Sequence, residues 1–288
     1  MRSVMIDHPN SWAKELETDG TIEKFIGVDM SLDESEIVRR TIGALMDTSL
    51  AKFLGRKAQN PIDGLCTFVE LHTPTVAALA HLLDLPGSPL DAVAKARNKH
   101  DTRRLMKAAG LPSPPNCLVE STADLDKAAA EVGFPAVLKP VSGAASLGVK
   151  RVDNMQELVA SYAEITKGLS ALVVSSGALV VSKGRADEVA AESKTDLTVM
   201  LELYLDGPEI DCDIVMARGE PLFAEVSDNG PTVEPYFNET WGVCPSLLPK
   251  AQQAALKQLY VLVCVTFALR RSAFSLFFVL FGFSLLLI

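Results

Sequence analysis

The sequence predicts an α/β protein with two structured parts and an apolar C-terminal tail. Short apolar runs alternate with amphipathic helical runs through residues 1–95, and a second series of strand and helix signals fills residues 96–258. From residue 259 to residue 288 the chain contains no acidic side chain. Alternation of strands and helices favours a small parallel sheet with helices packed on it. A chain of 288 residues is long enough for such a division.

The first part is expected to contain three strands and two helices. Apolar runs bounded by polar and turn-forming residues predict the strands at residues 3–6, 24–28 and 64–69. Apolar side chains recur at helical spacing between the last two strands. A second helix is expected from Thr73 until Pro86 stops it.

The second part begins with a helix at residues 99–109, which Gly110 ends, and a proline-rich linker follows. Further helices are expected at residues 125–132 and from residue 155. The expected strands are residues 136–139, 149–152, 198–204, 210–217 and 221–227. The last two are separated by Arg218 and Gly219, which predicts a hairpin.

The charge balance and the cysteines limit the functional classes. The chain has 27 basic and 36 acidic side chains, for a net charge of −9. This balance repels phosphate backbones and argues against nucleic acid as a partner. The five cysteines are scattered and form no C-x-x-C pair, so we expect reduced thiols and a cytoplasmic location.

A loop of small residues follows the strand at 136–139. Gly143 and Gly148 have the spacing of a Walker A loop, but Val149 stands where that motif needs lysine, and a strand rather than a helix follows. We therefore expect a loop between two strands. Its backbone N–H groups and the hydroxyls of Ser142 and Ser146 would close over an anion. An ordinary turn is the alternative.

Lys139 lies at the end of the strand before this loop. We expect it to be solvent-facing and to direct its charge at the same anion. On this interpretation, Lys139→Ala weakens anion binding with little effect on folding.

A second signal lies at residues 200–209, where an apolar strand runs into a turn. The backbone of such a segment can meet the edge of a purine, and Glu209 can accept hydrogen bonds from a ribose. The alternative is a solvated edge strand with acidic residues of no special role.

Taken together, these segments resemble the ATP-grasp superfamily of carboxylate–amine ligases, and within it the carnosine synthases and other dipeptide-forming L-amino-acid ligases. The resemblance rests on GFPAVLKP at residues 133–140 with its loop, and on ELYLDGPE at residues 202–209. NKHDTR at residues 98–103, DNGP at 228–231 and FNET at 237–240 agree with it.

The resemblance implies a Rossmann-like pre-ATP-grasp domain at residues 1–95, then an incomplete two-lobe α+β ATP-grasp domain at 96–258. It also implies roles for individual residues. Lys99 and Lys139 would bind ATP phosphates, Ser142, Gly143, Ala144 and Ser146 would cover them, Glu202 with the backbone of Leu203 and Leu205 would hold adenine, and Glu209 would hold the ribose.

The implied reaction is phosphoryl transfer from ATP to a carboxylate, followed by attack of an amine to form an amide, with amino acids as substrates and Mg²⁺ as cofactor. Glu239 is a candidate for holding a substrate ammonium group, and Glu70 for lining the substrate side. Two alternatives stay open. One is an ATP-binding remnant without turnover, and the other is a different ATP-grasp ligase chemistry.

The resemblance ends before the acidic and asparagine residues that bind Mg²⁺ in this family, so we expect no metal ligands and a C-terminally truncated ligase. The tail at 259–288 permits three interpretations: a membrane anchor, a buried helix, or a foreign end that replaces the native C-terminus. Residues 272–288 are uncharged and as a helix would extend about 25 Å, which is less than a bilayer core of about 30 Å.

Overall fold

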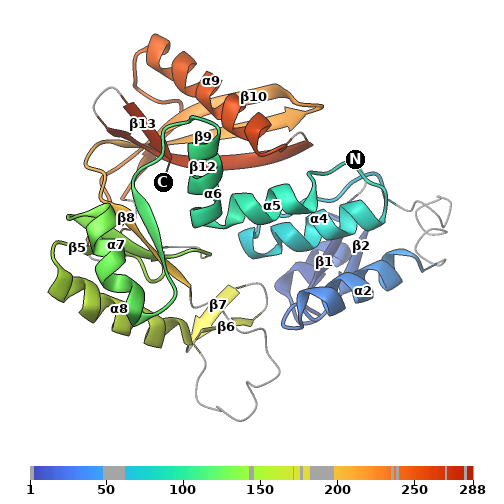
Figure 1. Cartoon of the computed structure of the whole chain (residues 1–288). Helices are drawn as coiled ribbons and strands as arrows, with labels where there is room; N and C mark the ends of the chain where they lie inside the picture. The colour runs from blue at the N-terminus through green and yellow to red at the C-terminus, as the bar shows by residue number, and fades with distance from the viewer. Residues whose placement is uncertain are drawn as a thin grey trace. The chain divides into compact units, whose positions relative to one another are not determined.

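A computed structural model describes residues 3–47, 62–142, 146–170, 172–175, 178–181, 198–234, 237, 240–269, 271–281 and 284–287. The chain forms two compact units. The first consists of Met1–Gly87 and Ser170–Thr195, and the second of Ser88–Leu169 and Asp196–Ile288. Figure 1 shows their elements.

The first unit contains a parallel strand pair and helices that follow it. Strand β1 (Val4–Asp7) pairs in parallel with β2 (Lys24–Gly27), at two of the three expected positions. Ile6 and Ile26 of this pair pack against buried residues from the strand end and from α2. The remaining elements are η1 (Trp12–Lys14), α1 (Glu15–Thr18), α2 (Glu34–Leu45), η2 (Glu70–His72), α4 (Thr73–Leu82) and the antiparallel pair β6 (Leu172–Ser175) and β7 (Ala178–Val181).

The strand expected at residues 64–69 does not form. The Val69 N–H donates to Thr67 Oγ1 at 3.0 Å, and the Phe68 side chain is fully exposed. A local side-chain bond of this kind competes with the hydrogen bonds of a sheet. The segment passes instead into the short helix η2.

The second unit contains two sheets. The first has the antiparallel order β3-β8-β4-β5, so β4 is an interior strand. Its strands are β3 (Asn116–Val119), β4 (Ala136–Pro140), β5 (Lys150–Val152) and β8 (Val199–Leu203). The accompanying helices are α5 (Leu90–Arg97), α6 (Lys99–Ala108), η3 (Thr122–Asp124), α7 (Leu125–Val132) and α8 (Met155–Ser170). The loop after β4 therefore joins two paired strands, as expected.

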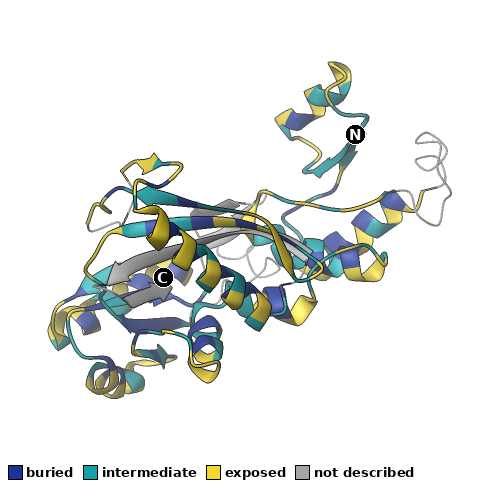
Figure 2. Ribbon diagram, turned by 90° about the horizontal axis from the view of Figure 1, so that it is seen from above, coloured by how far each residue is buried: buried dark blue, intermediate teal, exposed yellow. Residues whose placement is uncertain are grey.

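The second sheet has the order β11-β10-β9-β12-β13. Its strands are β9 (Glu209–Ala217), β10 (Glu220–Asn229), β11 (Gly242–Val243), β12 (Arg271–Phe281) and β13 (Ser284–Leu287). Helix α9 (Lys250–Thr266) lies on this sheet with its exposed residues directed outward (Figures 1 and 2). Alternate residues of β9 pack beneath it, and burial of each such side chain contributes about 1.5–3 kcal/mol relative to exposure. The core residues shared by these two elements include Ile210, Cys212, Ile214, Leu256, Tyr260 and Val263.

The described part of the apolar tail at 259–288 is divided between the end of helix α9 and two strands. Helix α9 continues without a break across residues 258 and 259, and its later part contributes the buried Tyr260, Val263 and Cys264 to the core. The next segment, β12, pairs with β9 along its length, for example Phe274 with Ile214. Within the described part of the chain, no helix has both the length and the hydropathy needed to cross a membrane. A buried helix was one of the three interpretations of the tail, but the described residues 271–281 and 284–287 form the strands β12 and β13.

Candidate functional site

The β3-β8-β4-β5 sheet presents two chemically different faces. The register pairs Leu138 with Leu201 on one face, and Val137 with Glu202 on the other. Because side chains alternate along a strand, Lys139 lies on the same face as Glu202. Charged groups of two neighbouring interior strands are thereby brought together.

Lys139, Glu202 and Arg103 of α6 form a buried ionic triad. Arg103 donates through Nε to Glu202 Oε1 and through Nη2 to Oε2 at 3.2 Å, and Lys139 Nζ donates to Oε2. The exposed fractions of Arg103, Lys139 and Glu202 are 1%, 4% and 3%. The expectation that Lys139 is solvent-facing is therefore wrong, because Lys139 lies on an interior strand and pairs with Glu202, which Arg103 of α6 also binds.

The triad has two cations and one carboxylate. Burial by itself would raise the pKa of Glu202, but Arg103 and Lys139 together lower that pKa to about 2. Burial lowers the pKa of the Lys139 ammonium group; Glu202 acts to raise it, whereas Arg103 lowers it further. An excess cation in a buried site is costly. Within the triad one carboxylate faces two cations, and Glu209 is a second carboxylate that raises the pKa of Lys139.

Glu202 is expected to make stability fall at acid pH. The pKa of Glu202 in the folded protein is about 2, below the ordinary value of 4.5. The ionised Glu202 therefore stabilises the fold above about pH 4.5, and this stabilisation is lost as the pH falls toward 2. The difference corresponds to about 3 kcal/mol. Denaturant unfolding of the wild type and of Glu202→Gln at several pH values measures this contribution. The free energy of unfolding of the wild type should fall more with acid than that of the variant. An equal fall in both proteins would contradict the lowered pKa of Glu202.

The start of α6 is held at the end of β4. The Lys99 N–H donates to the Val141 carbonyl at 2.8 Å, and Asn98 caps the helix by accepting from the Asp101 N–H at 3.0 Å. Lys99 and Arg103 are four residues apart, so they lie on the same side of α6. The structure therefore brings Lys99 to the strand end next to Ser142, which is half-buried.

The far end of the loop is held by a different contact. Ser146 has a φ of 55°, and its Oγ donates to the Phe237 carbonyl at 3.0 Å. Gly148, with a φ of 74°, closes the loop where a Cβ would lie 3.2 Å from the Pro140 ring. Gly143 and Ala144, both candidate residues, lie outside the described residues.

Two prolines end the backbone hydrogen bonding of β8. The Leu203 N–H donates to the Pro115 carbonyl at 2.9 Å, and the Tyr204 N–H donates to the Pro135 carbonyl at 3.0 Å. Proline has no N–H to donate in return. Pro115 therefore donates no hydrogen bond to the Leu203 carbonyl, and Pro135 donates none to the Tyr204 carbonyl. Leu205 follows, half-buried.

The remaining candidates differ in their surroundings. Glu209 begins β9 and is close enough to Lys139 to act on its pKa. Glu70 is exposed at the start of η2 in the first unit, and its carbonyl accepts from the Thr73 hydroxyl at 2.8 Å. Glu239 lies outside the described residues. The structure thus gathers Lys139, Glu202 and Glu209.

Arg103 is a residue that the sequence reasoning missed. It belongs to the NKHDTR segment, but no role was predicted for it there. Its spacing of four residues from Lys99 is the signal that could have found it. Sequence spacing, however, does not reveal that its partner is 99 residues away.

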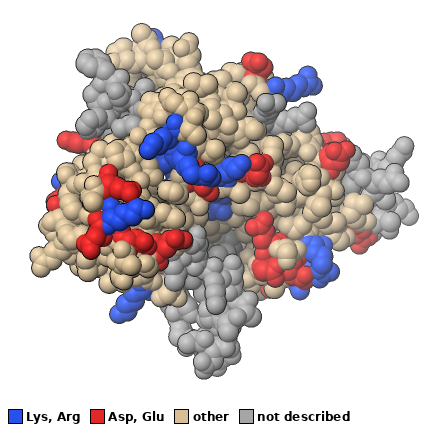
Figure 3. Space-filling view, in the orientation of Figure 1, with Lys and Arg blue, Asp and Glu red and all other residues tan. Residues whose placement is uncertain are grey.

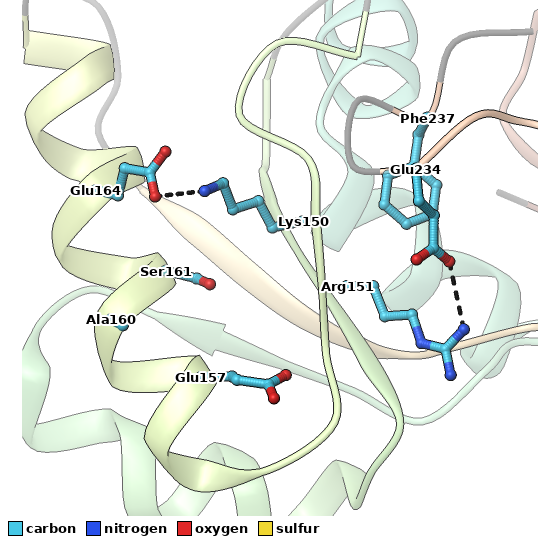
Figure 4. A pocket seen from close by; sticks show the side chains of 8 residues that line it. All are labelled: Lys150, Arg151, Glu157, Ala160, Ser161, Glu164, Glu234 and Phe237. Atoms are coloured by element: carbon cyan, nitrogen blue, oxygen red, sulfur yellow. Dashed lines mark hydrogen bonds and ion pairs between the residues drawn. The ribbon is translucent and has the colours of Figure 1, made fainter.

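A pocket of about 240 Å³ lies beside β5 and α8. It is lined by Lys150, Arg151, Glu157, Ala160, Ser161, Glu164, Glu234 and Phe237 (Figure 4). None of the triad residues lines it. On the face shown in Figure 3, acidic and basic side chains lie next to one another.

A metal site has no counterpart in the described residues. Nowhere in the described ranges do three His, Cys, Asp or Glu side chains lie close enough together to hold a metal ion. Mg²⁺ takes oxygen ligands, and in nucleotide sites one or two carboxylates act together with the phosphates of the nucleotide. No chemical step is assigned to a metal here.

Comparison with protein families identifies the second unit. Residues 132–276 match the model of the ATP-grasp domain, and this segment contains Lys139, Glu202 and the hairpin of β9 and β10. The chain belongs to the ATP-grasp family. The match extends through α9 into β12, so these elements are part of the ATP-grasp domain.

Known ATP-grasp proteins resemble the chain over most of its length. Human carnosine synthase 1 is 29% identical over 275 residues, which cover 93% of this chain and 30% of that protein. The chain therefore spans less than a third of that relative. The L-amino acid ligase from Bacillus licheniformis matches in structure with a TM-score of 0.67 and 21% identity, over 93% of this chain and 55% of that one.

A more distant structure shares the fold. The biotin carboxylase domain of the Hydrogenobacter thermophilus 2-oxoglutarate carboxylase, in complex with MgADP and bicarbonate, has a TM-score of 0.71 at 16% identity. The match covers 100% of this chain and 58% of that chain. These likenesses show the ATP-grasp fold.

Proposed function

We propose that this chain binds ATP in its second unit and belongs to an ATP-dependent ligase that joins a carboxylate to an amine. Lys139 and Lys99 bind the phosphates, and the loop from Ser142 covers them. The backbone of Leu203 and Leu205 holds the adenine edge, and Glu209 holds the ribose. The likeness to carnosine synthase and to an L-amino acid ligase supports amino acids as substrates.

The observation that carries this proposal is the charge of the triad. Arg103 and Lys139 share a single carboxylate within the triad, and Glu209, which acts on Lys139 from the start of β9, is the next negative charge. A phosphate group adds negative charge beside these two cations and accepts hydrogen bonds from the ammonium group. The strand end beyond this cationic site suits the base of a nucleotide, because the flanking prolines donate no hydrogen bond to the carbonyls of Leu203 and Tyr204.

The proposed reaction proceeds in two steps. A substrate carboxylate oxygen attacks the γ-phosphorus of ATP, the bond to the β,γ-bridging oxygen breaks, and ADP leaves with the electron pair. The amine then attacks the carbonyl carbon of the acyl phosphate, inorganic phosphate leaves, and the ammonium nitrogen releases its proton. Lys139 and Lys99 contribute by stabilising the charge on the transferred group and by orienting it.

The experiment that tests this function follows one oxygen atom. The full chain is incubated with ATP, Mg²⁺ and pairs of amino acids, one of them labelled with ¹⁸O in its carboxylate. The expected result is ADP release that requires both substrates, with ¹⁸O in the inorganic phosphate. Release of AMP and pyrophosphate would overturn the acyl-phosphate route.

Nucleotide binding is measured separately by calorimetry. ATP binding without turnover would support an ATP-binding remnant and contradict the ligase. A chain that does not bind ATP would overturn the whole proposal.

A further inference from the structure

The segment between β8 and β9, residues 204–208, is here called the hinge. Its first residue, Tyr204, is the last to donate a backbone hydrogen bond to the first sheet. Residues 205–208 have no helix or strand structure. Contacts of the Tyr204 side chain are therefore suited to fix the peptide groups on either side of it.

Arg151 of β5 makes such a contact. Its guanidinium carbon lies 4.4 Å from the centroid of the Tyr204 ring, a distance at which a cation is attracted to the ring face. Arg151 Nε donates to Asp153 Oδ1 at 2.8 Å, and Nη1 donates to Glu234 Oε1 at 3.3 Å. Two carboxylates from different segments thus orient the guanidinium over the ring.

The neighbouring residue, Lys150, points the opposite way. It forms an ion pair with Glu164 of α8, while Arg151 extends toward Glu234 and Phe237 (Figure 4). Alternation along β5 explains the difference. Lys150 and Arg151 are therefore adjacent cations, each paired with a glutamate, and Arg151 contacts the Tyr204 ring of the hinge.

A second contact joins the same hairpin to the same segment. Ser146, in the loop between β4 and β5, donates to the Phe237 carbonyl at 3.0 Å, and Arg151 reaches Glu234 three residues earlier. The hairpin of β4 and β5 is thus tied at two points to the segment after β10. Arg151 connects these contacts to the hinge.

We propose that Arg151 is a positioning residue for adenine: it holds Tyr204 against β5 and thereby sets the adjoining peptide groups of Leu203 and Leu205. This inference rests on the proposed ATP site. Arg151 acts through Tyr204 rather than on the nucleotide. It should therefore affect recognition of the base and leave binding of the phosphates unchanged.

The test compares ATP with inorganic tripolyphosphate, which has the phosphates without the nucleoside. Calorimetry measures both ligands with the full-length wild type, Arg151→Met and Lys150→Met. The two variants lose the same charge, and each breaks one glutamate pair. We expect Arg151→Met to weaken ATP binding about three- to thirtyfold, the range of a cation–ring contact. Tripolyphosphate binding should change less than about twofold in both variants.

A double-mutant cycle with Tyr204→Leu shows whether Arg151 acts through the ring. Once Tyr204 is leucine, Arg151→Met should cause no further loss of ATP affinity. If Arg151→Met fails to fold, Arg151→Lys gives the same comparison, since lysine keeps the charge but loses the planar stacking group.

Three results would overturn the inference. These are equal ATP affinities of Arg151→Met and Lys150→Met, an equal loss for ATP and tripolyphosphate, or a full additional loss in the Tyr204→Leu background. A wild type that binds neither ligand would contradict the proposed ATP site itself, so the two failures are distinguishable.

Discussion

Glu202→Ala is expected to lower the free energy of unfolding by about 3–5 kcal/mol, the cost of removing one partner from a buried ion pair. The variant leaves Arg103 and Lys139 next to each other, both nearly fully buried and both positive. The repulsion and the lost hydrogen bonds act in the same direction. Urea or thermal unfolding measures the loss.

The matched control is Glu225→Ala, which removes a glutamate whose partner is Lys257. That pair is 3.0 Å long, but both side chains are about 30% exposed, so its loss should cost about 1 kcal/mol or less. Similar losses in the two variants would contradict the assignment of the triad as a buried charge cluster.

Lys139→Met is expected to separate binding from stability. Methionine has nearly the volume of lysine and carries no charge, so the variant leaves Arg103 and Glu202 as a balanced pair. The free energy of unfolding should stay within about 1 kcal/mol, because replacing a buried ion by an apolar group is often neutral. ATP affinity should fall roughly 10- to 150-fold, since a hydrogen bond to a charged group contributes about 1.5–3 kcal/mol.

Lys150→Met is again the control, because Lys150 has the same charge and lies on the neighbouring strand, with its ion pair at the surface. ATP affinity within about twofold of wild type in Lys139→Met would remove Lys139 from the site. A Lys139→Met chain that does not fold would show that the triad needs both cations for stability.

Much of the local structure could be predicted from the sequence. The hairpin of β9 and β10 turns at Arg218 and Gly219, both with positive φ, where the turn was expected. Helix α6 ends at Ala108, before Gly110. These features depend on spacing and on residues within a few positions of one another, and such information is contained in a single stretch of chain.

The strand expected at residues 64–69 was an error, and the boundary expected after residue 258 falls inside a helix. In the first case a local hydrogen bond to Thr67 replaced the sheet. In the second, the apolar run was divided between α9, which covers the sheet, and β12, which pairs with β9. An apolar run of this length suits either element, and pairing with a distant strand decides between them.

In the candidate site, too, some features could be predicted from local sequence and others depended on long-range contacts. The sequence by itself determined the loop between two strands, the lysine before it and the acidic strand that resembles an ATP-grasp ligase. Only the tertiary structure decided that Lys139 is buried and shares Glu202 with Arg103, because these partners lie 63 and 99 residues from Glu202 along the chain. Burial and charge pairing depend on which strands become neighbours and on what covers them, and these long-range contacts have no signature in local spacing.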